Sequence, residues 1–365
     1  MPNVQLIGVS KFFGRIKALE DINLEIKEGE YVGILGPSGC GKTTLINCIT
    51  GIVEPTHGTI LIDGKSVINI PIERRDFAMV FQSIAIFPHM TVEQNAAYGP
   101  FVRDVPKQTQ GKISEEMLRL VDILDQKQLC PRSLSGGAKQ KTAVARALAN
   151  QEKLLILDEP ISALDYKVRV SLRYELRRLV KKLGLTAVHI THDQEEAMSI
   201  SDRLVILRAG RIVESGTPQQ LYEHPQTLFS MNFVGESNFL EGMIKSKRAQ
   251  ESYFRIEFRN HQYIDLQGLE GDFDQGESIV LAFRPETINF RFQEEDNTLR
   301  GTILRKRFMG GYIRYEVELL TDDLIIIDSP TLLEEKKKIY IQIDPQEARL
   351  FAAPEFGLKK VLALE

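Results

Sequence analysis

Short apolar runs alternate with amphipathic stretches through the first two thirds of the chain. Apolar runs bounded by turns are typical of buried strands, and they stand at 31–35, 77–81, 154–157 and 186–191. Between them, apolar residues recur every three or four positions, which predicts helices with one buried face. The longest stripe runs from Val168 to Leu183 and ends at Gly184. We therefore expect an α/β fold with buried parallel strands.

The pattern changes after Gly235, where long helical stretches give way to short strands separated by turns. The expected strands are 254–258, 279–283, 299–304, 313–319, 324–327 and 339–343. The sequence therefore predicts two domains. Residues 1–235 form the α/β domain, with a helical subdomain at about 83–153, and residues 236–365 form a small all-β barrel like those that bind oligonucleotides or oligosaccharides.

A glycine-rich turn joins the first buried strand to a helix that begins at Thr44. The segment Gly36-Pro37-Ser38-Gly39-Cys40-Gly41-Lys42-Thr43 fits the pattern G-x-x-x-x-G-K-[ST] without mismatch. A strand, a glycine turn and a helix together direct backbone N–H groups at an anion. Lys42 would reach the β- and γ-phosphates of a nucleotide, and the Thr43 hydroxyl would ligate Mg²⁺. A chance glycine turn is the alternative, and both flanks weigh against it.

Polar residues follow the other three buried strands directly. They are Gln82, the pair Asp158-Glu159, and His192. Open α/β sheets bind ligands at the carboxyl ends of their strands. A buried strand that ends in two acids needs a compensating charge, which Mg²⁺ on a phosphate would supply. Asp158 would hold the metal, and Glu159 would take a proton from an attacking water. Two solvated acids and a structural histidine are the alternatives.

Three further features allow a structural and a functional interpretation. Ser135 can cap a helix whose first residues, Gly136 and Gly137, leave its amides open to an anion. This is either half of a phosphate site or an ordinary glycine-rich helix start. Phe12-Phe13 is either core or a surface that stacks on a base. The apolar residues from Ile84 to Met90 either belong to the core or line a groove for a partner helix.

Composition narrows the classes of function. A chain of 365 residues can hold two cores, and a net charge of -4 without a basic block does not favour nucleic-acid binding. Cys40, Cys48 and Cys130 have no metal-binding spacing, which indicates a reducing cytoplasm. The start of the chain has no signal-peptide pattern. No apolar run approaches the roughly 18–20 residues that span a bilayer, so we expect a membrane role only through a partner.

The order of these parts resembles that of ABC-type ATPases over residues 3 to about 235. The matching parts are the phosphate loop, Gln82, Leu134-Ser135-Gly136-Gly137, Asp158-Glu159, Ser162-Ala163-Leu164-Asp165 and His192. Phe283-Arg284-Pro285-Glu286 and Phe308-Met309-Gly310-Gly311 are similar to segments of TOBE domains in importer ATPases of the maltose, spermidine/putrescine, ferric-iron and sulfate type. The resemblance implies a P-loop NTPase fold with a helical subdomain, followed by an OB-like TOBE domain.

The resemblance also implies a site that binds ATP and Mg²⁺ between two copies arranged head to tail. In one copy, Phe13 would stack on the adenine and residues 36–44 would bind the phosphates. The metal would be held by Thr43, Gln82 and Asp158. The residues that act in hydrolysis would be Lys42, Gln82, Glu159 and His192. The other copy would contribute Ser135, Gly136 and Gly137, with Asp165 at the seam. Ala138 and Lys141 stand where the family usually has Gln and Arg. We expect activity to survive, because the helix-terminal amides are unaffected.

By the same resemblance, the chain is the ATP-hydrolysing subunit of a membrane importer. It would lie at the cytoplasmic face of the membrane, against permease subunits whose short helix enters the Ile84–Met90 groove, and an external solute-binding protein would deliver the solute. Polyamine or ferric iron is slightly favoured, with sugar and sulfate open. The alternative is a soluble ABC ATPase without a membrane partner, but the chain has one cassette and no heptads.

Two expectations about further sites remain. The C-terminal domain would serve regulation or dimer contact, because no basic groove with stacking aromatics stands out for a nucleic acid. Cys40 is either a small residue that fits the turn or a redox-sensitive thiol whose thiolate is stabilised by Lys42 and the helix N-terminus.

Overall fold

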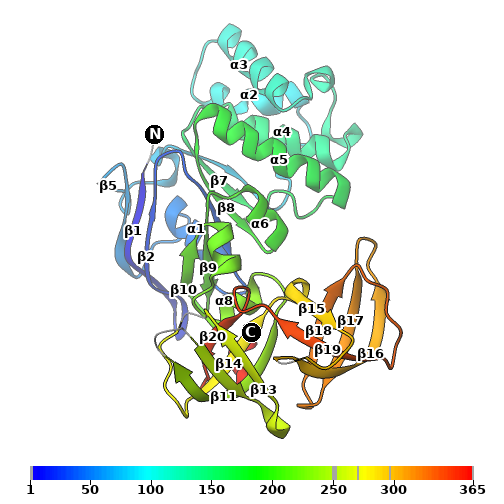
Figure 1. The fold of residues 1–365 in the computed structure, drawn as a ribbon. Coiled ribbons are helices and arrows are strands. Elements are labelled where there is room, and N and C mark those ends of the chain that lie inside the picture. The colour runs from blue at the N-terminus through cyan, green and yellow to red at the C-terminus, as the bar shows by residue number, and fades with distance from the viewer. Residues whose placement is uncertain (1–2, 249–252, 269–270, 296, 364–365) are drawn as a thin grey trace. The chain divides into compact units, whose positions relative to one another are not determined.

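The computed structural model describes residues 3–248, 253–268, 271–295 and 297–363, and the chain forms two compact units (Figure 1). The first unit runs to Gln219, and the second begins at Gln220. Each unit has its own hydrophobic core.

A six-stranded sheet lies at the centre of the first unit, in the order β10-β9-β3-β8-β7-β6. The strands are β3 (Tyr31–Leu35), β6 (Phe77–Val80), β7 (Leu154–Asp158), β8 (Thr186–Thr191), β9 (Arg203–Arg208) and β10 (Arg211–Gly216). All neighbours pair in parallel except β9 and β10, which form an antiparallel hairpin. The four buried strands predicted from the sequence are confirmed, and their carboxyl ends share one edge.

A second, antiparallel sheet of the first unit has the order β2-β1-β4-β5. Its strands are β1 (Val4–Phe13), β2 (Ile16–Ile26), β4 (His57–Ile62) and β5 (Lys65–Ser66). Helix α1 (Lys42–Thr50) shares a core cluster with this sheet and with the central one, through buried Leu45, Ile46 and Ile49. The phosphate loop is therefore held between the two sheets by the burial of the helix that follows it.

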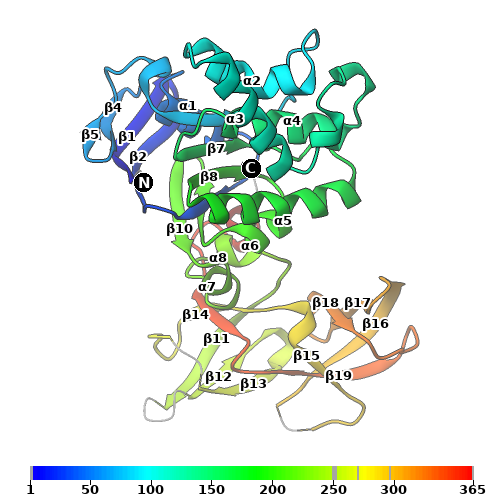
Figure 2. The same cartoon turned by 90° about the horizontal axis from the view of Figure 1, so that it is seen from above.

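Helices make up most of the rest of the first unit, and α2 to α5 lie together in Figures 1 and 2. They are α2 (Val92–Val102), α3 (Lys107–Leu120), α4 (Gly136–Leu148), α5 (Tyr166–Leu183) and α6 (Gln194–Ile200). Three 3-10 turns stand at Ile72–Arg74, Leu124–Gln126 and Pro131–Ser133. Residues 81–153, all of which the structure describes, contain helices and turns but no strand, as the predicted helical subdomain requires.

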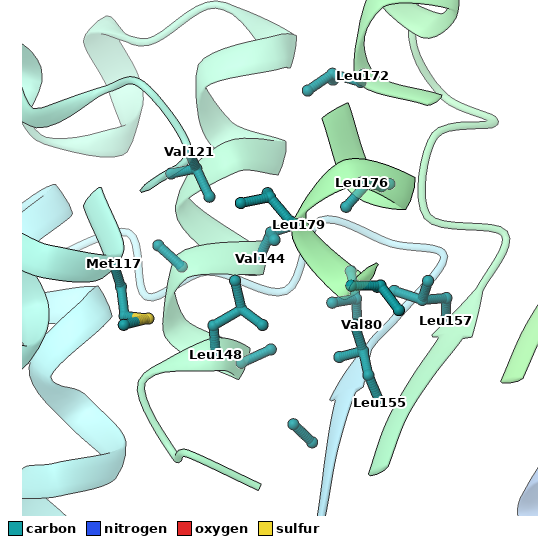
Figure 3. Close-up of a cluster of buried hydrophobic side chains, with 14 of the residues drawn as sticks. Val80, Met117, Val121, Val144, Leu148, Leu155, Leu157, Leu172, Leu176 and Leu179 are labelled. Atoms are coloured by element: carbon teal, nitrogen blue, oxygen red, sulfur yellow. The ribbon is translucent and has the colours of Figure 1, made fainter. Parts of the chain in front are cut away.

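One core cluster joins these helices to the sheet (Figure 3). Val144 and Leu148 of α4 lie among side chains of the α3 region, of α5 and of strands β6 and β7. The predicted stripe of α5 supplies Leu172, Leu176 and Leu179, and Gly184 ends that helix at φ 64°. Burial of this stripe fixes α5 against the strand that ends in Asp158, so the site is built on packed elements.

The second unit is all-β apart from short helices. Its sheets have the orders β13-β12-β11-β14-β20 and β15-β19-β16-β17-β18, with antiparallel neighbours throughout. The strands are β11 (Asn238–Arg248), β12 (Tyr253–Glu257), β13 (Tyr263–Gln267), β14 (Ser278–Phe283), β15 (Ile288–Arg291), β16 (Leu299–Phe308), β17 (Ile313–Leu319), β18 (Leu324–Ser329), β19 (Lys338–Ile343) and β20 (Arg349–Ala352). One core draws on both sheets, and the all-β prediction is confirmed.

The units divide after Gln219, earlier than the boundary at 235 expected from the sequence. The helices α7 (Pro218–Glu223) and α8 (Leu228–Phe233) occupy this stretch, and α9 (Leu358–Leu362) lies near the C-terminus. The Arg284 guanidinium, which is buried, donates to the carbonyl oxygens of Tyr222 (3.0 Å) and Met231 (2.9 Å). These bonds attach the segment to the β-rich unit, whereas its helical texture alone suggested the first domain.

Candidate phosphate-binding and hydrolytic site

The phosphate loop begins where β3 ends and leads directly into α1. Gly41 is the N-cap of α1 at φ 111°, and a Cβ there would lie 2.5 Å from the carbonyl oxygen of Ala18. Only glycine fits this backbone and this contact. Within the described residues, no side chain caps α1 and no acid stands in its first turn. The N-terminal amides of α1 are thus open to an anion, which fits the phosphates of a nucleotide.

Lys42 is folded over this loop rather than extended into solvent. Its side chain is buried, and its Nζ donates to the carbonyl oxygens of Gly36 (2.7 Å) and Pro37 (2.9 Å). The ammonium therefore lies at the turn, and the two groups that accept its hydrogen bonds there are neutral carbonyls. A phosphate in the loop would complete this partial neutralisation.

Three of the predicted residues meet at one carboxylate oxygen. Gln82 Nε2 donates to Glu159 Oε2 at 3.0 Å, and His192 Nδ1 lies 3.0 Å from the same oxygen. The three residues follow β6, β7 and β8, which are neighbours in the sheet. Glu159 adopts φ 44°, which is uncommon for a residue with a side chain, and its N–H donates to Ile190 O at 2.9 Å. Such backbone strain is typical of functional positions.

Asp158 is half-buried beside this cluster. Burial raises the pKa of its carboxyl group, and the neighbouring Glu159 carboxylate raises it further, while His189 and Lys42 act in the opposite direction. A carboxylate in this position is stabilised by a nearby cation. Asp158, Thr43 and Gln82 are oxygen donors at the same edge of the sheet as the phosphate loop, and this donor chemistry fits Mg²⁺.

The structure separates Phe12 from Phe13. Phe13 is 49% exposed at the end of β1, with Lys11 Nζ 5.0 Å from the centre of its ring. Phe12 makes an edge contact with His57, with ring centres 5.8 Å apart. Phe13 is therefore not a core residue, and its ring is available to stack.

Ser135 caps its own helix: its hydroxyl accepts the Ala138 N–H at 3.2 Å. Among the described residues no hydrogen bond joins its side chain to the phosphate loop of the same chain. A Cβ on Gly137 would lie 2.9 Å from Val168 Cγ1, so this glycine is needed for the contact between α4 and α5. The sequence alone does not indicate this packing reason for the glycine, because Val168 lies 31 positions away on another helix.

The other predicted positions have local structural roles as well. Asp165 is the N-cap of α5 and accepts the Val168 N–H at 3.2 Å. Ala138 lies in the core of the helical region, and Lys141 pairs with Glu175 at 2.9 Å. Neither departure from the family pattern disturbs the amides at the start of α4.

An apolar groove of about 390 Å³ lies on the helical region. It is lined by His89, Met90, Gln94, Ala97, Tyr98, Phe101 and Gln110. Phe101 is 62% exposed, and the ring of Phe87 lies 4.4 Å from that of Tyr98. Only His89 and Met90 of the segment from Ile84 to Met90 line this groove, and α2 supplies most of the rest.

Comparison with known proteins agrees with this geometry. A family model described as ABC transporter matches residues 19–162, and one described as TOBE domain matches residues 281–351. The spermidine/putrescine import ATP-binding protein PotA of Thermobifida fusca is 38% identical, over 95% of this chain and 93% of that protein. The Fe(3+) ions import ATP-binding protein FbpC of Rhizobium etli is 41% identical, over 88% of this chain and 89% of that protein. The chain belongs to the ABC transporter ATP-binding family.

Solved structures also resemble this ABC ATPase. The dimeric structure of the bacterial ABC transporter cassette MJ0796 matches with a TM-score of 0.53 and 32% identity, over 59% of this chain and 98% of that cassette. A post-hydrolysis structure of the same cassette, bound to ADP and Pi, matches with the same TM-score and identity. In the part of the ATPase that the structure describes, no helix is long and apolar enough to cross a membrane.

Of the two interpretations of Cys40, the structure of this ABC ATPase favours the small residue that fits the turn. Cys40 is buried, and burial raises the pKa of its thiol, although the charge of Lys42 opposes the shift. Burial likewise raises the pKa of Cys48 to about 11. The sequence places Cys40 beside a lysine and a helix N-terminus, but it does not reveal that the Sγ atom points inward, where desolvation dominates.

Proposed function

We propose that this ABC ATPase hydrolyses ATP between two of its own copies and thereby drives a solute importer. The convergence of Gln82 and His192 on the Glu159 carboxylate, beside an open phosphate loop, carries the proposal. The relatives are named for import of spermidine/putrescine or of ferric ions, which supports a polyamine or ferric iron as the solute.

The phosphate loop would bind the nucleotide through its amides and through Lys42. The two carbonyl contacts of Lys42 Nζ keep the ammonium at the loop, so little reorganisation is required when phosphates arrive. Phe13 would stack on the adenine. Thr43, Gln82 and Asp158 would hold Mg²⁺, which supplies charge neutralisation at the phosphates when it is bound.

Glu159 would act as the general base. Its Oε2 is contacted by Gln82 and His192, which orients the carboxylate, and Oε1 would accept the proton of an attacking water. His192 would hold Glu159 in place from β8, and Gln82 would do so from β6.

The second copy would complete the site with the start of α4. Ser135 and Gly136 are exposed, and the N–H groups of Gly136 and Gly137 would approach a phosphate from another chain, whereas the Ala138 N–H donates to the Ser135 hydroxyl. Asp165 would lie at the seam between the copies. The dimeric form of the related cassette supports this arrangement.

The apolar groove beside α2 would receive a short helix of a membrane-spanning permease subunit, since its lining is apolar with few charges. This contact would hold the ATPase at the cytoplasmic face of the membrane. An external solute-binding protein would deliver the solute to the permease. A soluble ABC ATPase without such a partner is less well supported, because the relatives are named as import proteins over most of the chain.

The role of Glu159 is tested by Glu159→Gln. A general base contributes about 10²–10⁴-fold, so phosphate release should slow by that factor while labelled ATP still binds. Glu73→Gln, an exposed carboxylate in the 3-10 turn before β6, is the matched control and should retain full turnover. Near-normal hydrolysis by the Glu159→Gln protein would remove Glu159 from this role.

Uptake measurements test the proposal that the solute is a polyamine or ferric iron. Vesicles holding the ATPase with its permease subunits should accumulate either labelled spermidine or ferric iron in an ATP-dependent way. Uptake of neither compound, with intact ATPase activity, would contradict both assignments.

A further inference from the structure

Arg169 lies behind the candidate site and contacts two of its loops at once. Its Nη2 donates to the carbonyl oxygens of Ser162 (3.3 Å) and Leu164 (3.0 Å), and its Nη1 lies 3.6 Å from Asp193 Oδ2. Ser162 and Leu164 precede α5, whereas Asp193 directly follows His192. One guanidinium therefore joins the segment 162–165 to the loop that carries His192.

Asp193 fixes the backbone on the far side of His192. Its Oδ1 accepts the Glu196 N–H at 2.9 Å and so caps α6, and its own N–H donates to Thr191 Oγ1 at 3.0 Å. Its Oδ2 faces both Arg169 and Arg173 of α5. A displacement of the Asp193 carboxylate would thus shift the peptide of His192, whose ring lies 3.0 Å from Glu159 Oε2.

The segment 162–165 is tied to Glu159 as well. The Ser162 hydroxyl donates to the Glu159 carbonyl oxygen at 3.0 Å, and the Ser162 N–H donates to it at 3.3 Å. Arg169 is therefore connected to Glu159 through Ser162 on one side, and to His192 through Asp193 on the other. Its Nε is buried and has no hydrogen-bond partner among the described residues, so the three oxygen contacts determine where the guanidinium lies.

We propose that Arg169 is a positioning residue that links the segment 162–165 to His192. The inference rests on the proposed function, in which His192 holds Glu159 and Asp165 lies where the second copy docks. Docking of that copy would move or immobilise the segment 162–165, and Arg169 would pass the change to Asp193. This restraint would hold His192 at the 3.0 Å distance from Glu159 Oε2 that the single chain already shows.

Lysine cannot replace arginine in this arrangement. A planar guanidinium presents several donors in a fixed fork, so it binds two carbonyl oxygens and a carboxylate together. An ammonium on a flexible stem keeps the charge but loses this geometry. Arg169→Lys therefore separates positioning from charge.

The test is a double-mutant cycle. It measures kcat and KM for ATP in the unchanged protein, in Arg169→Lys, in His192→Ala and in the variant that carries both substitutions. Small displacements of catalytic groups are costly, so Arg169→Lys should lower kcat about tenfold or more and change KM less than about twofold. In the His192→Ala background, Arg169→Lys should change kcat less than about twofold, because residues that act through one another are not additive. Arg178→Lys, on an exposed position of α5, is the control and should change neither kcat nor KM in either background.

Equal losses from Arg169→Lys in both backgrounds would show a merely structural role and overturn the inference, as would an unchanged kcat with His192 intact. If Arg169→Lys lowers the thermal midpoint, Asp193→Asn replaces it, because that variant keeps the Oδ1 cap and removes the charge facing Arg169. It should show the same dependence on His192. Full turnover by His192→Ala alone would instead overturn the proposed role of His192, and the inference with it.

Discussion

At the scale of single residues, the site depends on one oxygen atom of Glu159. Gln82 and His192, which contact it, are 77 and 33 positions away along the chain. Each could be named from the sequence, because each follows a buried strand directly. Their meeting point could not be named, because it depends on the order β8-β7-β6 in the sheet and on the backbone turn at Glu159.

A buried polar network beside the site was not anticipated from the sequence. Tyr31 Oη lies 2.7 Å from His189 Nδ1, His189 Nε2 lies 3.1 Å from Glu196 Oε1, and Thr191 Oγ1 donates to Glu196 Oε2 at 2.7 Å. Burial by itself would raise the pKa of Glu196, but the contacts with His189 and Thr191 and the charge of Arg173 together outweigh it and lower the pKa. The folded protein therefore favours the ionised carboxylate.

This lowered pKa predicts a pH-dependent stability. A group whose folded pKa is lowered stabilises the protein above its unfolded pKa, near 4.5, and loses that effect as the pH falls through the folded value. Glu196→Gln should therefore reduce the free energy of unfolding by about 1.5–3 kcal/mol at pH 7. The difference from the unchanged protein should shrink as the pH falls below about 4.5.

Urea unfolding at several pH values measures the difference in the free energy of unfolding between Glu196→Gln and the unchanged protein. Glu195→Gln, whose side chain is 71% exposed on the same helix, is the control and should change stability by about 1 kcal/mol or less. A difference between Glu196→Gln and the unchanged protein that stays constant across the pH range would contradict the prediction.

At the scale of elements, the close approach of α4 and α5 explains a glycine that the family pattern had assigned only to nucleotide contact. Gly137 leaves no room for a Cβ beside Val168. The same contact holds the start of α4 at the end of the segment 162–165. The helix terminus proposed to face the second copy is thus positioned by packing within its own chain.

Gly137→Ala should therefore destabilise the protein by about 1–3 kcal/mol, as expected when a methyl group is forced into a filled space. Adding Val168→Ala removes the clashing Cγ1 atom and should restore part of the loss. Gly111→Ala in α3, where a Cβ would meet nothing within 4 Å, should instead stabilise by about 0.5–1 kcal/mol. Equal urea midpoints for Gly137→Ala and Gly111→Ala would rule out the packing argument.

The strands of the second unit show where pattern reading fails. The predicted runs became β12, β14, β16, β17, β18 and β19, but β11, β13, β15 and β20 were not anticipated. Strand β11 is interrupted by Gly242 and is polar at its end, yet it lies between β12 and β14. A Cβ at Gly242 would lie 2.7 Å from Ile256 Cγ2, so the glycine serves a close strand contact that only the pairing reveals.

At the scale of the whole molecule, the proposed site is incomplete in one chain. The start of α4 is exposed, and its cap residue bonds only to its own helix among the contacts described. Two copies arranged head to tail would bring that helix end to the phosphate loop of the other copy. This arrangement predicts a cross-link between chains.

Two differently tagged proteins test it, one with Ser38→Cys in the exposed part of the phosphate loop and one with Ser135→Cys. Both carry Cys130→Ser to remove the exposed native thiol, and Glu159→Gln to retain ATP. With MgATP, a short bifunctional maleimide should give a heterodimer that carries both tags, and omission of ATP should reduce the yield several-fold. Only monomeric products, or a yield independent of ATP, would count against the composite site.

The parts of this protein that depend on local chemistry could be predicted from the chain before its fold was known. The phosphate loop, the four buried strands, the stripe of α5 and the polar residues at strand ends follow from patterns within a few positions. Such patterns are local because strand burial, helix periodicity and glycine turns involve neighbouring residues. The order of these parts also sufficed to indicate the family.

Features that depend on contacts between distant segments emerged only from the folded structure. It brought Gln82 and His192 to one oxygen of Glu159 and gave Gly137 its neighbour Val168. It also attached residues 220–236 to the second unit through Arg284, and turned the Cys40 thiol inward. These outcomes depend on which strands become neighbours and on which atoms lose water when they do, and the local pattern of a chain records neither.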